Sequence, residues 1–235
     1  PILYRDVSNV IALFLARREG VRDVLRATGL VPAVVVGDRA LVGVSFYEYR
    51  NTTVGVYNEV GTAIFALREG ERAPRLGLAD MYVPPRWRTV GAWVVDLPVT
   101  TAAANAAGRE LWGYPKFVTA IPFRMRGRDV ETSVLDPETR APIVTLAGRM
   151  GPGLPAPPLG LMTYSRLDGA LVRTHIDVRG WVTAHPAGTV RLSVGPSTHG
   201  MAERLRALGL VDARPVLLLR TDRFQSKLHA GTRVL

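Results

Sequence analysis

The sequence of 235 residues contains no cysteine. This absence excludes disulfide bonds, thiolate metal ligands and cysteine nucleophiles. Long apolar runs are missing as well, since none approaches the ~20 residues that a membrane-spanning helix needs. The first residues include a short apolar patch but no basic leader, and no small-residue cleavage site follows it. We therefore expect a soluble, cytoplasmic protein that has no membrane partner.

Lysine is scarce in this chain. It carries 30 lysine and arginine side chains in total, yet only Lys116 and Lys227 are lysines. Arginine keeps its proton in proteins and forms no imine, whereas a lysine that loses its proton becomes a nucleophile. A lysine retained in apolar surroundings is therefore a candidate for covalent catalysis.

The formal net charge of +10 has two interpretations. Nucleic-acid-binding proteins concentrate basic residues in runs or on one helix face. Here the arginines are scattered, with small clusters such as Arg124, Arg126 and Arg128. We therefore expect no nucleic-acid partner, and a basic surface that attracts small anionic substrates.

Short strands dominate the pattern along the chain. Segments rich in Val, Ile, Phe, Tyr and Thr, separated by turn residues, predict strands at 34–36, 41–49, 54–67, 90–97, 117–125, 130–135, 143–146, 171–178, 190–194 and 216–221. Many short strands without alternating helices favour an antiparallel sheet or barrel. The predicted fold class is mainly β (α+β): an antiparallel closed or cone-like β-barrel with a few peripheral helices, formed by one domain over residues 1–235.

Apolar periodicity and capping residues predict three helices, at 17–29, 98–108 and 197–209. The stretch at 151–160, GPGLPAPPLG, matches the dinucleotide-binding pattern G-x-G-x-x-A. Its four prolines are incompatible with the helix whose N-terminus would bind a phosphate. We expect a stiff surface loop there, and no nucleotide cofactor.

Lys116 lies in the stretch GRELWGYPKF. Pro115 fixes its own backbone and favours an extended conformation for Tyr114. The rings of Trp112, Tyr114 and Phe117 flank the amine in sequence, and an aromatic environment that excludes water favours the uncharged form of an amine. The alternative is a solvated lysine at the end of a strand, as most lysines are.

Two motifs resemble the acetoacetate decarboxylase family. One is GRELWGYPK, preceded by an alanine-rich helix, and the other is VYNEVGTAIF around Glu59. In that family the lysine of the first motif forms a Schiff base with the substrate, and the second motif contains an active-site glutamate. The resemblance therefore implies that Lys116 and Glu59 are catalytic, that no cofactor is needed and that the protein is a homo-oligomer. Because Trp112, Tyr114 and Phe117 flank the lysine in sequence, we expect them to contact the substrate.

Glu59 has a physical case of its own. Strand alternation places it on one face with Tyr57, Ala63 and Phe65, while the opposite face is also apolar. A carboxylate that is buried on both sides must be paired or functional. The alternative to a catalytic role is a structural ion pair with an arginine.

The sequence departs from the family pattern at two places. Phe117 stands where the family decarboxylases carry a second lysine, so burial must replace the effect of a neighbouring charge. The family's site also includes an arginine near the N-terminus, for which Arg5 is the best match and Arg50 and Arg109 are the alternatives. If no arginine holds the substrate carboxylate, aldol condensation and dehydration become serious alternatives to decarboxylation.

The resemblance predicts a lyase that acts on a small keto acid, most simply by decarboxylating acetoacetate or a related β-keto acid. The alternatives are an aldolase-dehydratase acting on pyruvate-like substrates with the same lysine, and a non-catalytic barrel that binds a small ligand.

Other candidate residues have weaker support. Pro1 could act as a catalytic N-terminal amine, but the repeated β-α-β units of such enzymes are missing from the sequence. The four histidines, at positions 175, 185, 199 and 229, show no metal-ligand spacing. We therefore expect no metal site.

Overall fold

Seven strands close into a barrel in the computed structural model, which describes residues 1–73, 77–84 and 87–234. Around the ring these strands are β15 (Leu217–Leu228), β1 (Ile2–Arg17), β4 (Arg39–Thr52), β5 (Tyr57–Arg68), β6 (Gly91–Asp96), β11 (Leu161–Leu167) and β12 (Ala170–Gly180). The ring closes where β12 pairs with β15. The predicted closed barrel is confirmed, with one parallel pair, β6 with β11, among antiparallel neighbours.

Shorter strands extend the barrel sheet at its margins. They are β2 (Leu30–Pro32), β3 (Val35–Val36), β10 (Leu154–Ala156), β13 (Val182–His185) and β16 (Thr232–Arg233). Strand β10 lies within the proline-rich segment that we predicted to be a loop, and it pairs with β13 at the end of the strand order. Proline is tolerated there because an edge strand leaves one side without ladder partners.

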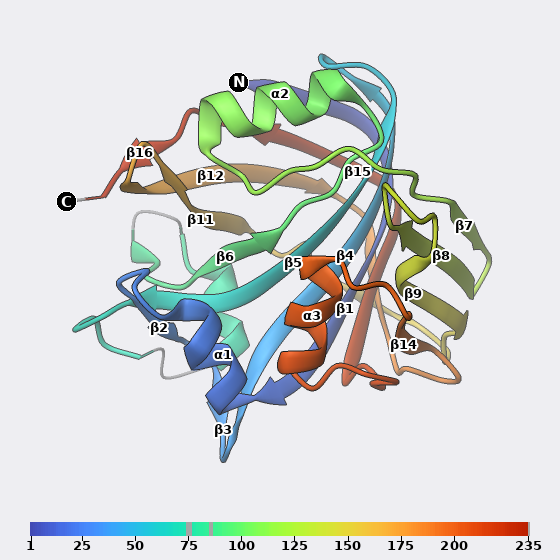
Figure 1. The fold of residues 1–235 in the computed structure, drawn as a ribbon, viewed down its shortest axis with the longest axis horizontal. Helices are drawn as coiled ribbons and strands as arrows, with labels where there is room; N and C mark the ends of the chain where they lie inside the picture. Colours follow the sequence, from blue (N-terminus) through green and yellow to red (C-terminus); the bar gives the residue numbers. More distant parts are fainter. Residues whose placement is uncertain (74–76, 85–86, 235) are drawn as a thin grey trace.

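A second sheet of four strands lies beside the barrel (Figure 1). Its order is β14 (Arg191–Val194), β9 (Pro142–Arg149), β8 (Asp129–Leu135) and β7 (Phe123–Arg126). Aliphatic residues from this sheet and from the barrel strands form one continuous buried core. The strand predicted at 117–125 is regular only from Phe123 onwards.

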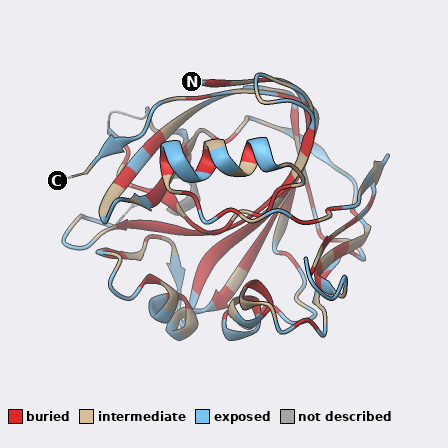
Figure 2. Ribbon diagram, turned by 45° about the horizontal axis from the view of Figure 1, so that its top comes forward, coloured by how far each residue is buried: buried red, intermediate tan, exposed pale blue. Residues whose placement is uncertain are grey.

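The helices lie outside the barrel strands. Figure 1 shows α2 (Ala102–Trp112) on one side of the barrel, and α1 (Arg18–Leu25) and α3 (Gly200–Ala207) on the opposite side. A short 3₁₀ helix, η1, covers Gly77–Tyr82. The Thr101 side chain caps α2 by accepting a hydrogen bond from the Ala104 N–H. Exposed and buried residues alternate along α2 in Figure 2, and its buried residues face the barrel interior.

Strand β1 was not predicted, although it is the longest strand. Its second half, from Val10 to Ala16, is largely buried on both faces, so it reads as a continuous apolar run without alternation. Its first half contains a register shift around Asp6, which interrupts the period of two. In the described part of the chain, no helix is long and apolar enough to cross a membrane.

Candidate active site

The turn after α2 fixes the direction in which the chain approaches Lys116. Gly113 ends the helix in the left-handed region, with φ of 63°. A Cβ atom at this position would lie 2.0 Å from the Arg166 carbonyl oxygen, so only glycine fits. The Arg109 guanidinium then donates a hydrogen bond of 3.0 Å to the Lys116 carbonyl oxygen. The end of α2 and the lysine are thus tied together.

Gly108 leaves the space that the lysine side chain occupies. A Cβ atom on Gly108 would lie 2.3 Å from Lys116 Cε and 2.5 Å from Cδ. The aliphatic stem of Lys116 therefore lies directly against the backbone of α2. This contact explains why a glycine precedes the arginine and glutamate of the motif.

Backbone hydrogen bonds link the lysine segment to β5 through the intervening residues 97–99. The N–H of Leu97 donates to the Pro115 carbonyl oxygen at 3.2 Å, and the N–H of Val99 donates to the Phe117 carbonyl oxygen at 2.9 Å. The segment that contains Leu97 and Val99 lies between the two, because Val99 also forms an antiparallel bridge with Glu59 of β5. Segments far apart in the sequence therefore place Lys116 and Glu59 on the same side of the barrel interior.

Lys116 and Glu59 form a buried ion pair. The distance from Lys116 Nζ to Glu59 Oε2 is 2.5 Å. Only 5% of the lysine side chain and 8% of the glutamate side chain are exposed.

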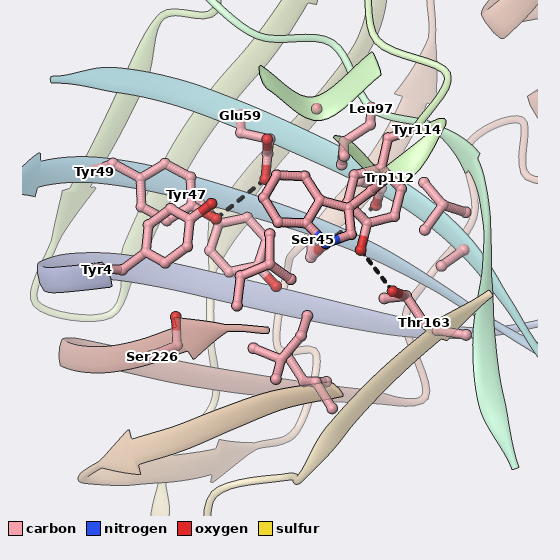
Figure 3. Close-up of a pocket in the computed structure, with 18 of the residues that line it drawn as sticks. Tyr4, Ser45, Tyr47, Tyr49, Glu59, Leu97, Trp112, Tyr114, Thr163 and Ser226 are labelled. Atoms are coloured by element: carbon pink, nitrogen blue, oxygen red, sulfur yellow. Dashed lines mark hydrogen bonds between the residues drawn. The ribbon is translucent and has the colours of Figure 1, made fainter. Parts of the chain in front are cut away.

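Tyrosines surround the pair because of the register between β4 and β5. Tyr47 lies opposite Glu59, and Tyr49 lies opposite Tyr57. The Tyr49 hydroxyl donates to Glu59 Oε1 at 3.1 Å, which leaves Oε2 to the lysine (Figure 3). The ring centroid of Tyr57 lies 5.7 Å from Lys116 Nζ, within the range of a cation–π contact.

These tyrosines stay protonated at neutral pH. Burial is the main cause that raises the pKa of Tyr4, Tyr49 and Tyr57, and the Glu59 carboxylate adds to it. Burial also raises the pKa of Tyr114 to about 12. The phenols therefore act as neutral hydrogen-bonding groups and carry no charge into the site.

A cavity of about 140 Å³ opens inside the barrel at the lysine. Trp112 and Tyr114, two of the three rings expected to contact substrate, line this cavity. The Tyr114 hydroxyl bonds to Thr163 Oγ1 at 2.7 Å (Figure 3). The Trp112 indole N–H donates to the His229 carbonyl oxygen at 2.8 Å. Both rings are thereby held as walls of the cavity.

Arg5 was predicted to contact substrate, and the structure places it elsewhere. Tyr4 lines the cavity, so the next residue of β1 must point to the outer face, and Arg5 is exposed. Arg50 and Arg109, the alternative arginines, also lie outside the cavity. Arg50 forms ion pairs with Asp6 and Glu48 outside the barrel, and Arg109 is exposed on α2. Among the residues that the structure describes, no arginine lines the cavity.

Phe117 was also predicted to contact substrate, and this prediction is wrong for the cavity observed. The Phe117 ring packs against the ring of His199, with centroids 4.5 Å apart, and joins the core between the barrel and the second sheet.

The other candidate residues lie apart from the lysine. Pro1 is exposed, and none of the histidines lines the cavity. His185 is buried and bonds to Thr183 and to the Gly151 carbonyl oxygen. Within the described ranges, no group of three or more His, Asp or Glu side chains is arranged to hold a metal ion.

Sequence reasoning missed Tyr4, Tyr47 and Tyr49. Alternation alone would have placed Tyr47 and Tyr49 on one face of β4, just as it placed Tyr57 with Glu59 on β5. The missing step was the pairing of β4 with β5, which brings the two faces together inside the barrel. Tyr4 could not be found in this way, because β1 was not recognised as a strand.

The family model described as "Acetoacetate decarboxylase (ADC)" matches residues 2–206. The chain therefore belongs to this family. No match was found among curated proteins.

Several solved structures share the fold. One of acetoacetate decarboxylase has a TM-score of 0.70 and 18% identity, and the match covers 100% of this chain and 89% of that chain. The acetoacetate decarboxylase of Legionella pneumophila has a TM-score of 0.70 and 16% identity, with 100% and 87% covered. The enduracididine biosynthesis enzyme MppR, complexed with the condensation product of pyruvate and imidazole 4-carboxaldehyde, has a TM-score of 0.71 and 13% identity, with 99% and 89% covered. At these identities the likeness establishes the fold.

Proposed function

We propose that this protein is a Schiff-base-forming lyase that decarboxylates acetoacetate or a related β-keto acid. The observation that carries the proposal is the buried contact of 2.5 Å between Lys116 Nζ and Glu59 Oε2 at the wall of the cavity. Membership of the chain in the acetoacetate decarboxylase family supports it. Both residues come from the motifs that resemble those of the family.

The reaction begins with an uncharged amine. When a proton passes from Lys116 Nζ to Glu59 Oε2, an ion pair becomes a neutral pair, and the total charge of the cavity is unchanged. Because both side chains are buried, little water is present to stabilise the separated charges. The transfer turns Lys116 into a nucleophile and Glu59 into an acid without leaving a separated charge in the buried site.

Imine formation at Lys116 Nζ is followed by loss of carbon dioxide from the bound substrate. Nζ attacks the ketone carbon, the former carbonyl oxygen takes up protons and leaves as water, and an iminium ion remains. The bond to the β-carboxylate then breaks, its electron pair forms the enamine double bond, and carbon dioxide leaves. Glu59, which has given its proton to the departing water, takes up one proton from solvent and delivers it to the enamine carbon. Water then hydrolyses the iminium to ketone and free amine, and the proton released returns to Glu59. One proton is consumed overall.

Tyr49 positions Glu59 in this scheme. Its hydroxyl holds Oε1, so Oε2 remains directed at the lysine through the proton transfers. A hydroxyl with a raised pKa keeps its proton at neutral pH and can only donate to the carboxylate. The tyrosine therefore orients the acid–base group without competing for its proton.

A second candidate reaction begins with the same imine at Lys116. MppR, which has the same fold, is known in complexes with pyruvate and with a condensation product of pyruvate. If the enamine here is formed by proton loss and then attacks an aldehyde, the reaction is an aldol condensation and dehydration. Lys116 and Glu59 would have the same roles in both branches.

The two candidates differ in their products. Purified protein should be incubated with acetoacetate while carbon dioxide is measured, and with pyruvate plus an aldehyde while the absorbance of a conjugated enone is followed. Carbon dioxide release above the spontaneous rate is the expected result. An enone without carbon dioxide would assign the aldolase branch, and neither product would support the non-catalytic ligand-binding barrel.

A further inference from the structure

Trp112 is a wall of the cavity that close packing fixes only in part. Open space adjoins the ring on the cavity side, so that side gives it no neighbouring atoms. The main chain of Trp112 is held separately, because the Ser165 hydroxyl donates to its carbonyl oxygen at 2.6 Å. The indole N–H donates to the His229 carbonyl oxygen at 2.8 Å, and a buried indole normally needs such a partner. The direction of the ring therefore depends on His229.

His229 begins a segment that lies along β12. Residues 229–234, which we call the strap, include the short strand β16, and Figure 1 shows β16 beside β12. The N–H of His229 donates to the His175 carbonyl oxygen at 3.0 Å, and the N–H of Val234 donates to that of Leu171 at 2.9 Å. The family model matches residues 2–206, so the strap lies outside the part of the chain that defines the family.

Gly231 allows the strap to lie close to the indole. A Cβ atom on Gly231 would lie 2.5 Å from Val172 Cγ1 and 3.5 Å from Trp112 Cδ1. The first distance is too short for two carbon atoms, since contacts between them are favourable at about 3.5–4.0 Å. Val172 is buried and has little room to give way. A side chain at position 231 therefore moves the strap away from β12, and with it the carbonyl group that holds Trp112.

One side-chain contact fastens the strap at the residue that holds the indole. His229 Nε2 lies 2.7 Å from Asp177 Oδ2 on β12. The hydrogen bond from His229 is the main cause that lowers the pKa of Asp177, so the carboxylate is ionised at neutral pH. Because 36% of the histidine side chain and 60% of the aspartate side chain are exposed, this contact is weak and can be removed without unfolding the barrel.

We infer that the strap positions Trp112: the His229 carbonyl oxygen holds the indole as a wall of the cavity, Gly231 permits the close approach, and Asp177 fastens the strap at His229. These three residues do not line the cavity, so they act on it only through Trp112. The consequence for the reaction rests on the proposed function. A wall that is released weakens the binding of the keto acid and leaves Lys116 in place, because Arg109 holds the lysine main chain.

Hydrogen exchange of the Trp112 indole N–H measures the strap directly. This N–H exchanges only when its hydrogen bond opens, so the exchange rate reports how often the strap releases the ring. The protein is labelled with ¹⁵N, and the indole signals of its four tryptophans are followed in deuterated buffer at one pH. Trp112→Phe identifies the Trp112 signal, and Trp181, which is 86% exposed, is the internal reference. In the unmodified protein the Trp112 signal should persist long after that of Trp181.

Three alanine substitutions separate the parts of the inference. Gly231→Ala should speed exchange at Trp112 at least about tenfold, because it displaces the strap. Asp177→Ala removes a weak exposed contact and should speed exchange about two- to fivefold. Thr232→Ala, at an exposed strap residue, is the matched control and should leave the rate unchanged. An unchanged rate in folded Gly231→Ala, or equal exchange at Trp112 and Trp181 in the unmodified protein, would overturn the inference. If Gly231→Ala does not fold, Asp177→Ala decides, and an unchanged rate there overturns it.

Kinetics separate positioning from a general loss of stability. In Gly231→Ala, KM for the preferred keto acid should rise at least about threefold, while kcat stays within about twofold of that of the unmodified protein. A substitution that only unfolds part of the protein would lower the apparent kcat and leave KM unchanged, and that result would contradict the role of the strap in binding. If the unmodified protein decarboxylates no keto acid, the proposed function fails, and the exchange rates still decide whether the strap positions Trp112.

Discussion

The barrel interior and the second sheet bury their residues in different ways. The core shared with the second sheet consists of aliphatic side chains such as Val134, Val144 and Leu146, which are fully buried and in contact. Around the cavity, the buried set is instead rich in tyrosine, together with Lys116 and Glu59. The first region gains free energy from close packing. The second leaves open space at two ionisable groups, which a structural core would fill.

Their polar groups differ as well. In the loop after β8, the Asp136 carboxylate accepts hydrogen bonds from the Ser197 hydroxyl at 2.5 Å and from the N–H groups of Glu138 and Thr139. Two of these donors are backbone groups of the same turn, and the third belongs to a segment 61 residues away, so the carboxylate is held by hydrogen bonds on both of its oxygens. Lys116 and Glu59, which are 57 residues apart, instead meet at a cavity. For this reason we place the proposed chemistry in the barrel interior and assign a structural role to the second sheet.

Substitution of Lys116 by alanine should have the largest effect on activity. It removes the amine that forms the imine, so we expect kcat/KM for the preferred keto acid to fall on the order of 10⁴-fold or more. Lys227→Ala, which removes the other lysine, is the matched control and should retain full activity. Comparable loss in both variants, measured by carbon dioxide release, would contradict the assignment of the nucleophile.

Substitution of Glu59 by glutamine keeps the shape of the side chain and removes its acid–base function. A positioned general acid–base contributes about 10²- to 10⁴-fold, so kcat should fall within that range. The control is Glu110→Gln, an exposed acid on α2. If Glu59→Gln lowered the stability of the protein and left kcat of the folded protein unchanged, Glu59 would be a structural ion-pair partner.

Leu146→Ala should lower the stability of the core shared with the second sheet and leave the activity unchanged. Leu146 on β9 is fully buried in the core of the second sheet. Truncation of such a side chain lowers the free energy of unfolding by about 2–5 kcal/mol. We expect that loss in chemical denaturation, with an unchanged kcat/KM for the folded fraction. Leu154→Ala, at an exposed leucine on β10, should change neither quantity.

The tyrosines predict loss of stability at alkaline pH. Burial raises the pKa of Tyr114 to about 12, while tyrosine in an unfolded chain ionises near about 10. Above that pH the unfolded chain releases a proton that the folded protein retains, so unfolding becomes more favourable as pH rises. In Tyr114→Phe, the free energy of unfolding should fall less steeply above about pH 10 than in the unmodified protein. Equal slopes would show that Tyr114 does not titrate in this way.

The lowered pKa of Asp136 predicts a smaller loss of stability at acidic pH. The Ser197 hydroxyl and two backbone N–H groups lower its pKa to about 2, below the value of about 3.9 expected in an unfolded chain. Its stabilising contribution is complete above the higher value and is lost as pH falls through the lower one. The difference in unfolding free energy between the unmodified protein and Asp136→Asn should therefore shrink from about pH 4 to pH 2. A constant difference would contradict this origin of the shift.

Local patterns predicted much of this fold. Alternating Val, Tyr and Phe residues identified most barrel strands, and the alanine-rich stretch identified α2. Strand β1 was missed because both faces of its second half are largely apolar, which removes the alternation that marks a strand. Strand β11 was missed because it carries polar residues on both faces, Thr163 and Ser165 on one and Arg166 on the other. The pairing of β6 with β11 in parallel depends on contacts across 70 residues, and no local pattern encodes it.

The candidate site could also be predicted from the sequence only in part. Lys116 and Glu59 stood out because a rare amine and a carboxylate within an apolar strand are chemically unusual. Arg5 was misplaced because its direction depends on the phase of β1, which became visible only when Tyr4 was seen to face the cavity. Phe117 was misplaced because proximity in sequence to Lys116 was taken as proximity in space.

Reductive trapping with acetoacetate measures the central claim directly. Borohydride is added during turnover, and peptide mass spectrometry compares the two lysines of the chain. An imine at the buried amine predicts a reduced adduct at Lys116, with Lys227 at the level of unspecific labelling. An unmodified Lys116 under conditions of excess substrate, or equal modification of both lysines, would contradict the account.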